Sequence, residues 1–174
     1  MTHFDEIYEI AADDHGLITT AEAREAGITR SELKRWVDIG KLLKRGHGVY
    51  KLARYAPTEY DRYAEAVALV GKGSFLFGES VLAMHGLALV NPSRLTVGTT
   101  KRIRKKLPDW VKPVMVANKR TTYYEGIPSQ SIAEAILECK GTVMLERLKD
   151  AADDARAEGL ITKDEHDRLK KELI

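Results

Sequence analysis

Two clusters of lysine and arginine are the feature of this sequence whose residue types and spacing predict chemistry. Residues 30–56 contain 8 basic and 2 acidic residues, and residues 101–120 contain 8 basic and 1 acidic residue. Neutral or acidic stretches flank both clusters, and the whole chain of 174 residues carries a net charge of only +2. Because a local excess of positive charge attracts polyanions, these two segments predict contact with an anionic partner, first of all nucleic acid.

The residues that could support catalysis have unsuitable spacing. The segment 71–74 (Gly-Lys-Gly-Ser) resembles the end of a phosphate-binding loop, but the loop's first glycine is missing and glycine follows the lysine. Ser80 and His85 lie five residues apart on one predicted helix, so their side chains point about 140° apart. The acidic cluster 164–167 is typical of a helix start, and Cys139 is typical of a small core residue. We therefore expect a protein that is not an enzyme, with no catalytic residue, metal site or cofactor.

The N-terminal sequence predicts three helices. Apolar residues three and four positions apart indicate a first helix that includes Phe4 and Ala11. Two Thr-x-x-Glu motifs, at 19–22 and 29–32, are typical of helix N-termini. They predict a short helix over 20–26 that stops at Gly27 and a third helix from 29 to Gly40. Two helices joined by so short a turn are typical of a helix-turn-helix.

A glycine-containing turn between two short apolar runs follows the third helix. The runs cover residues 42–45 and 49–52 and predict a β-hairpin, the wing of a winged helix-turn-helix. A helix fits the major groove of DNA while basic residues on a hairpin neutralise phosphates. We therefore expect this region to bind double-stranded DNA. The expected contact residues are Arg30, Ser31, Lys34, Arg35, Lys41, Lys44, Arg45, His47 and Lys51.

A boundary is predicted at Pro57-Thr58, where a new helix begins. We expect residues 1–56 to form a winged helix-turn-helix DNA-binding domain and residues 57–174 to form a C-terminal domain. In the second domain, β-like runs at 94–97 and 111–116 flank a basic connection, and a helix through 132–137 precedes a tail of two helices broken at Gly159. The expected fold class is α+β: a winged helix-turn-helix, then a mixed α/β domain with a helical tail. The basic connection contains Lys101, Arg102, Arg104, Lys105 and Lys106.

Apolar runs, the N-terminal residues and the cysteine content indicate the cellular location of the protein. No apolar run approaches the roughly 18–20 residues of a membrane span. The N-terminus is acidic and lacks the features of a secretory signal, and Cys139 is the only cysteine. We therefore expect no membrane partner and a cytoplasmic protein.

Two ordered sequence blocks resemble a known family. The first runs from Gly16 through the Thr-Thr-Ala-Glu motif to Tyr50, and the second runs from Gly78 through Met84-His85-Gly86 to the segment 126–129 (Gly-Ile-Pro-Ser). In this order the blocks resemble the AbiEi-type antitoxins and transcriptional regulators of type IV (abortive-infection) toxin–antitoxin systems, which act in phage defence. The acidic helical tail after Thr142 has no close match in that pattern.

The resemblance implies an antitoxin with two roles. The winged helix would repress its own operon by binding inverted repeats in the promoter, and the C-terminal domain would counter a nucleotidyltransferase-like toxin without forming a stable complex. Members of the family have a positively charged C-terminal face, and the basic connection could supply one here, for DNA or antitoxic contact.

Two alternatives stay open. The chain could be a stand-alone winged-helix regulator whose second domain senses a ligand, which a closed apolar pocket would favour. It could also be a nucleic-acid enzyme that carries a winged helix, which would need carboxylates gathered with a lysine. The carboxylates available over residues 57–120 are widely spread: Glu59, Asp61, Glu65, Glu79 and Asp109.

Overall fold

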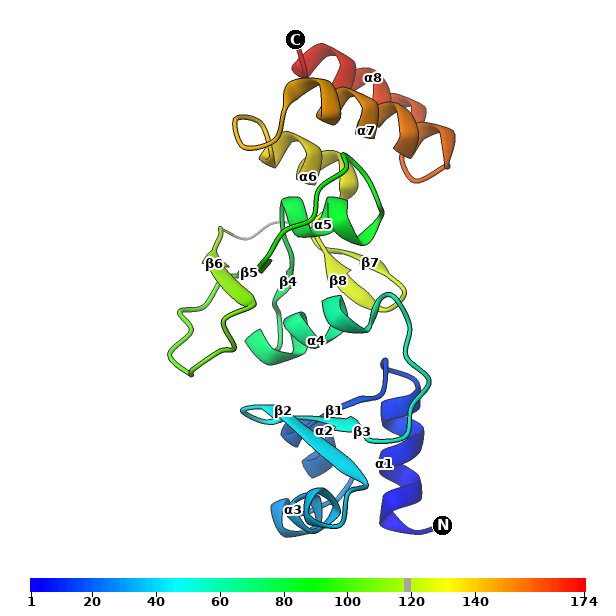
Figure 1. Cartoon of the computed structure of the whole chain (residues 1–174), viewed down its shortest axis with the longest axis vertical. Coiled ribbons are helices and arrows are strands. Elements are labelled where there is room, and N and C mark those ends of the chain that lie inside the picture. The colour runs from blue at the N-terminus through cyan, green and yellow to red at the C-terminus, as the bar shows by residue number, and fades with distance from the viewer. Residues whose placement is uncertain (118–119) are drawn as a thin grey trace. The chain divides into compact units, whose positions relative to one another are not determined.

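The computed structural model describes residues 1–117 and 120–174, which form helices and two β-sheets (Figure 1). The expected α+β fold class is therefore confirmed. By their contacts, residues 1–72 with 103–108 form one compact unit, and residues 73–102 with 109–174 form a second. Each unit contains one of the two sheets.

The first unit alternates helices with short strands. Its elements are α1 (His3–Ala12), β1 (Leu17–Thr19), α2 (Thr20–Glu25), α3 (Arg30–Asp38), β2 (Leu42–Gly46), β3 (Val49–Leu52) and α4 (Asp61–Val70). The hairpin and the helices expected at 20–26 and 29–40 are confirmed within a residue or two at each end. Helix α1 ends at Ala12, before the expected end near Gly16, and α4 begins at Asp61, after the expected start at Pro57-Thr58.

Threonine caps begin the first three helices. Thr2, Thr19 and Thr29 each accept a hydrogen bond from the backbone N–H three residues on, which satisfies a donor that has no partner within the helix. At α1 and α3 the carboxylate of the acidic residue three positions on accepts a hydrogen bond from the backbone N–H of the cap threonine, which completes a capping box. Gly27 and Gly40, with φ of +78° and +81°, follow α2 and α3, in a conformation that side chains other than glycine rarely adopt.

The sheet of the first unit has the order β1-β3-β2, with both pairs antiparallel. Strand β1 was not expected from the sequence. One face of this sheet packs on the three helices around a core that includes Ile7, Ile18, Leu33, Trp36 and Leu52. The register shifts between Lys44 and Gly46, a bulge that ends the regular pairing next to the hairpin turn.

Helix α4 groups with the first unit, although its sequence lies beyond Pro57. Two ion pairs join α4 to the β2–β3 hairpin: Lys51 Nζ lies 3.6 Å from a carboxylate oxygen of Asp61, and Arg45 pairs with Glu65. The expectation that residues 1–56 form one domain and residues 57–174 another stays a prediction.

The second unit is built on a mixed sheet of order β6-β5-β4-β8-β7. Its strands are β4 (Phe75–Leu76), β5 (Leu95–Thr99), β6 (Val111–Met115), β7 (Thr122–Tyr124) and β8 (Ile127–Ser129), and α5 (Glu79–Met84) follows β4. The strands expected at 94–97 and 111–116 are confirmed. They pair in parallel, so the connection between them must cross from one end of β5 back to the start of β6.

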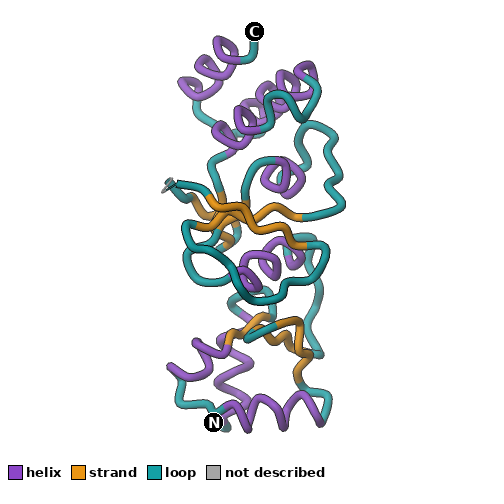
Figure 2. Tube along the Cα trace, turned by 90° about the vertical axis from the view of Figure 1, so that its left-hand side faces the viewer, coloured by secondary structure: helices purple, strands orange, loops and turns teal. Residues whose placement is uncertain are grey.

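Three helices complete the second unit. They are α6 (Ile132–Glu138), α7 (Leu145–Ala157) and α8 (Lys163–Glu172), with α7 and α8 packed side by side (Figure 2). The sequence predicted two tail helices broken at Gly159, and this is confirmed. None of the helices in the described residues has the length and apolar character needed to cross a membrane.

Candidate nucleic-acid interface

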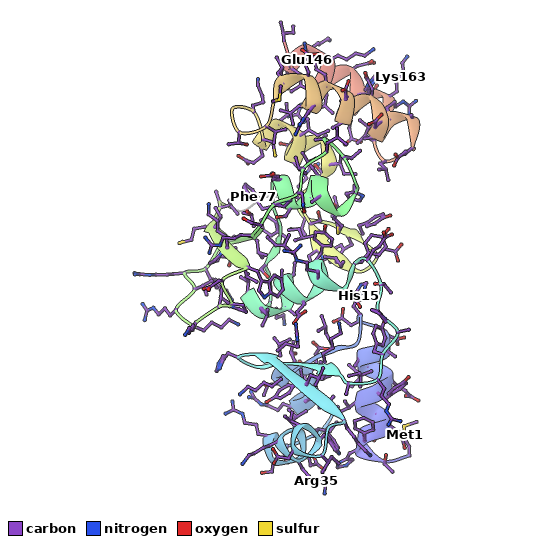
Figure 3. The ribbon with its side chains drawn as sticks, viewed as in Figure 1. Met1, His15, Arg35, Phe77, Glu146 and Lys163 are labelled. Carbon is purple, nitrogen blue, oxygen red and sulfur yellow. The ribbon has the colours of Figure 1, made fainter. Side chains whose placement is uncertain are left out.

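Helix α3 separates an apolar face from a basic one. Leu33 and Trp36 are buried in the core of the first unit. The exposed side carries the four residues expected from the sequence, which lie in two pairs four positions apart: Arg30, Ser31, Lys34 and Arg35. Figure 3 marks Arg35 on this helix. The structure therefore brings these four side chains to one helix surface.

Contacts from α1 hold both ends of α3. At the N-terminal end, His3 Nδ1 lies 2.6 Å from Glu32 Oε1, and this pair raises the pKa of His3. The ring of Phe4 packs edge-on against Trp36, with centroids 5.4 Å apart. The same ring lies 4.6 Å from Lys41 Nζ, a cation–π contact that places Lys41 just after the C-terminal end of α3.

The hairpin divides its polar residues between the two faces of the sheet. Lys44 lies opposite Tyr50 in the antiparallel register, and residues directly opposite share a face. Tyr50 packs against the helical core, so Lys44 is exposed on the side of the sheet where α3 lies. His47 is exposed in the turn between β2 and β3.

Arg45 and Lys51 are engaged with α4. Arg45 Nε donates to Glu65 Oε1, and Glu65 is 5% exposed. Lys51 Nζ lies 3.6 Å from Asp61, whose other carboxylate oxygen lies 3.5 Å from His15 Nδ1. Thr58 donates both its N–H and its hydroxyl to Asp61, and these bonds keep the pKa of this buried carboxyl low against the opposing effect of burial.

The basic connection does not behave as one uniform surface. Lys105 is half-buried, and burial lowers its pKa. Its ammonium lies 3.6 Å from the position that a Cβ on Gly71 would take, at the C-terminal end of α4, where the helix dipole favours a cation. The other four basic residues are exposed: Lys101, Arg102, Arg104 and Lys106.

The residues set aside as catalytic candidates have structural partners. Ser80 Oγ accepts the backbone N–H of Thr96 at 2.7 Å, while His85 ends α5 and packs against the ring of Tyr124 at 4.4 Å. Cys139 is buried at the end of α6, and burial raises its pKa to about 12. Within residues 1–117 and 120–174, no group of three His, Cys, Asp or Glu side chains is placed to hold a metal ion.

Two clefts in the second unit bear on the ligand-sensing alternative. Thr100 and residues 115–117 line one of about 640 Å³, and the other, of about 490 Å³, lies between the 140–145 segment and Ile174. Both are open to solvent, so neither has the closed apolar character that this alternative predicts.

Sequence reasoning missed the roles of Asp61 and Glu65. Their spacing of four places both carboxylates on one face of α4, among alanine and valine residues, and an acidic pair on an apolar helix face is a signal of buried ion pairs.

Comparison with known proteins gives a family for the N-terminal segment. Residues 5–53 match the family model described as "Transcriptional regulator, AbiEi antitoxin", so the resemblance predicted from the sequence is confirmed over these residues. None of the curated proteins with which the chain was compared matches it. A crystal structure of the RV2827C protein from Mycobacterium tuberculosis is similar over 97% of this chain and 71% of that chain, with 16% identity and a TM-score of 0.47.

Proposed function

We propose that this protein is a DNA-binding transcriptional regulator and antitoxin that is not an enzyme. The observation that carries the proposal is the exposed basic face of α3, held at both ends by α1, within a segment that matches an antitoxin regulator family. Helices α2 and α3 then act as the helix-turn-helix, and the β2–β3 hairpin acts as the wing.

The geometry supports separate roles on DNA for α3 and for the basic residues of the hairpin and of the end of α3. Helix α3 lies in the major groove, where Arg35 and Arg30 can donate two hydrogen bonds to a guanine edge and Ser31 can contact a base or phosphate. Lys41, at the end of α3, and Lys44 and His47, on the hairpin, contact flanking phosphates. The first group supplies selectivity, and the second supplies affinity that depends on salt.

The biological setting follows from the family resemblance. The protein binds inverted repeats in its own promoter, represses its operon in the cytoplasm and counters a nucleotidyltransferase-like toxin of a type IV system without a stable complex. The exposed residues of the basic connection supply the positive face for DNA or antitoxic contact. Phage defence by abortive infection is the process that such a pair of proteins serves.

A salt-series titration tests the DNA-binding role. The full chain is titrated against its own upstream region and against a scrambled duplex of equal length. We expect promoter-selective binding whose log affinity falls linearly with log salt, with a slope of about −0.9 per phosphate contacted. Equal affinity for both duplexes would remove the operator-binding proposal.

Two single variants assign the contacts. Arg35→Ala should weaken promoter binding by about 1–3 kcal/mol and relax selectivity, because a bidentate base contact is lost. Lys44→Ala should weaken binding to both duplexes alike and reduce the salt slope by about 0.9, because a phosphate contact is lost. Unchanged affinity in both variants would exclude α3 and the hairpin as the DNA-binding surface.

A further inference from the structure

The hairpin is attached to α4 by a buried charge. Glu65 is 5% exposed, and among the described residues its ion pair is with Arg45 of β2. Taking a carboxylate out of water is costly unless an opposite charge compensates it, so the pair must stay closed for Glu65 to remain buried. Arg45 itself keeps 42% of its side chain exposed, so its guanidinium also meets solvent.

A second contact joins the same two elements one residue further on. Gly46 ends β2, and a Cβ added there would collide with Leu69 Cδ2 of α4. The backbone at Gly46 therefore packs against the Leu69 side chain of α4, which would have to shift to admit a side chain at this position. Lys51 of β3 adds a third contact through Asp61. The sheet face opposite the helical core is thus fixed to α4 by charge and by close packing.

These contacts bear on the position of the hairpin turn. Lys44 precedes Arg45 and His47 follows Gly46, so both proposed phosphate contacts flank the two residues that α4 holds. Strand β2 is an edge strand of the β1-β3-β2 sheet, and the bulge at residues 44–46 interrupts its regular pairing with β3 just before the turn. The position of the β2 edge and of the turn therefore depends also on what they pack against, which includes α4.

We propose that Arg45 is a positioning residue for DNA binding: paired with Glu65, it fixes the hairpin so that Lys44 and His47 reach the phosphates. This inference rests on the proposed function. It reassigns Arg45, which its sequence position made a candidate DNA contact, to a role that acts through its neighbours. It also extends the DNA-binding element to α4, which lies beyond the segment 5–53 that matches the family model.

The Glu65→Ala variant distinguishes a positioning role of Arg45 from a phosphate contact, because the two roles predict opposite changes in promoter affinity. If Arg45 positions the hairpin, loss of its partner should weaken promoter binding by about tenfold, in the range of coupling measured between contacting residues. If Arg45 contacts a phosphate, removing Glu65 frees the guanidinium and removes a negative charge, so affinity stays the same or rises. The second result would overturn the proposal.

The double variant Arg45→Ala with Glu65→Ala provides the second measurement. In the positioning role it binds as Glu65→Ala alone does, with the same salt slope, because the pair is already broken. A further loss of affinity with a slope smaller by about 0.9 would identify a phosphate contact and overturn the proposal. Glu59→Ala is the matched control, because this exposed residue carries the same charge in the same unit, and its loss should leave affinity unchanged or slightly higher.

Amide hydrogen exchange tests the positioning role without DNA. In Glu65→Ala, the ladder amides of β2 and β3 should exchange about tenfold faster than in the original protein, while the amides of Leu33 and Trp36 in α3 keep their rates. Equal rates at Lys44 and Tyr50 would overturn the proposal even if the protein binds DNA. If the chain fails to select its promoter but the hairpin amides respond as expected, the proposed function fails and the structural coupling stands.

Discussion

His85 shows at the scale of one residue how burial sets a protonation state. It lies half-buried at the end of α5 against Tyr124, and burial lowers its pKa from 6.5 to about 4. The folded protein therefore holds a neutral imidazole at pH values where the unfolded chain binds a proton. This histidine contributes stability above pH 6.5, and the contribution is lost as pH falls from 6.5 toward 4.

The His85→Gln variant should reduce this acid sensitivity. Between pH 7 and pH 5 the original protein should lose about 2 kcal/mol of unfolding free energy through His85, and the variant should not. Urea unfolding at both pH values measures the difference. His3→Gln is the control: Glu32 raises the pKa of His3, so its favourable pairing is present at low pH and is lost only as pH rises through that raised value. If His85→Gln loses as much stability as the original protein, burial does not control this group.

The exposed face on which a site residue lies could be predicted from the sequence where that residue belongs to a helix with regular apolar spacing. The spacing of Arg30, Lys34 and Arg35 around Leu33 and Trp36 places them on the exposed face of α3, as expected. Arg45 and Lys51 differ because their partners lie on α4, at positions 65 and 61. The sequence reports that both are basic, but an ion pair with a residue ten or twenty positions away depends on packing that local spacing does not encode.

At the scale of elements, the caps decide where the helices begin. Thr29 and Glu32 form a capping box at α3, and Thr162 and Glu165 form the same arrangement at α8. Each satisfies backbone donors that the first turn of a helix leaves without partners. The same motif therefore orders the proposed recognition helix and the last helix of the chain.

Loss of the cap at α3 should affect DNA binding as well as stability. Thr29→Ala should cost about 1 kcal/mol of unfolding free energy and weaken promoter binding, because the first turn of α3 carries Arg30 and Ser31. Chemical denaturation and the promoter titration measure the two effects. Thr162→Ala should cost a similar amount at α8 and leave promoter affinity unchanged. Equal losses of affinity in both variants would mean that α3 has no special role.

Strands were harder to predict than helices because their partners are distant. Strand β1 has three residues and pairs with β3 some thirty positions later, so neither length nor alternation identifies it. The β7–β8 hairpin around Gly126 was also missed, since its three-residue strands carry too few positions to establish a period. The strands β5 and β6 were found from their runs of β-branched residues, but their parallel pairing was not.

At the scale of the whole molecule, the two basic clusters have different surroundings. The cluster at 30–56 is gathered by α3 and the hairpin within one unit, with two of its cations committed to α4. Residues 101–106 of the second cluster lie in the crossover between β5 and β6, where the chain has no regular structure and Lys105 lies against the end of α4. The net charge of +2 conceals this division, but charge counted by segment reveals it.

Of the two contacts proposed for the exposed cations of the crossover, with DNA or in toxin neutralisation, we predict the second. We expect their replacement by glutamine, with Lys105 retained because it packs on α4, to abolish protection against the cognate toxin while promoter affinity and unfolding free energy stay near the original values. The residues to replace are Lys101, Arg102, Arg104 and Lys106. A growth-rescue assay and the promoter titration give the two readings. The control removes four exposed cations from α7 and α8 and should protect fully: Arg147, Lys149, Lys170 and Lys171. Full protection by the crossover variant would show that these cations are not needed. Because both variants lose the same charge, equal loss in both would show that position within the fold does not matter, and either result would remove this role from the crossover.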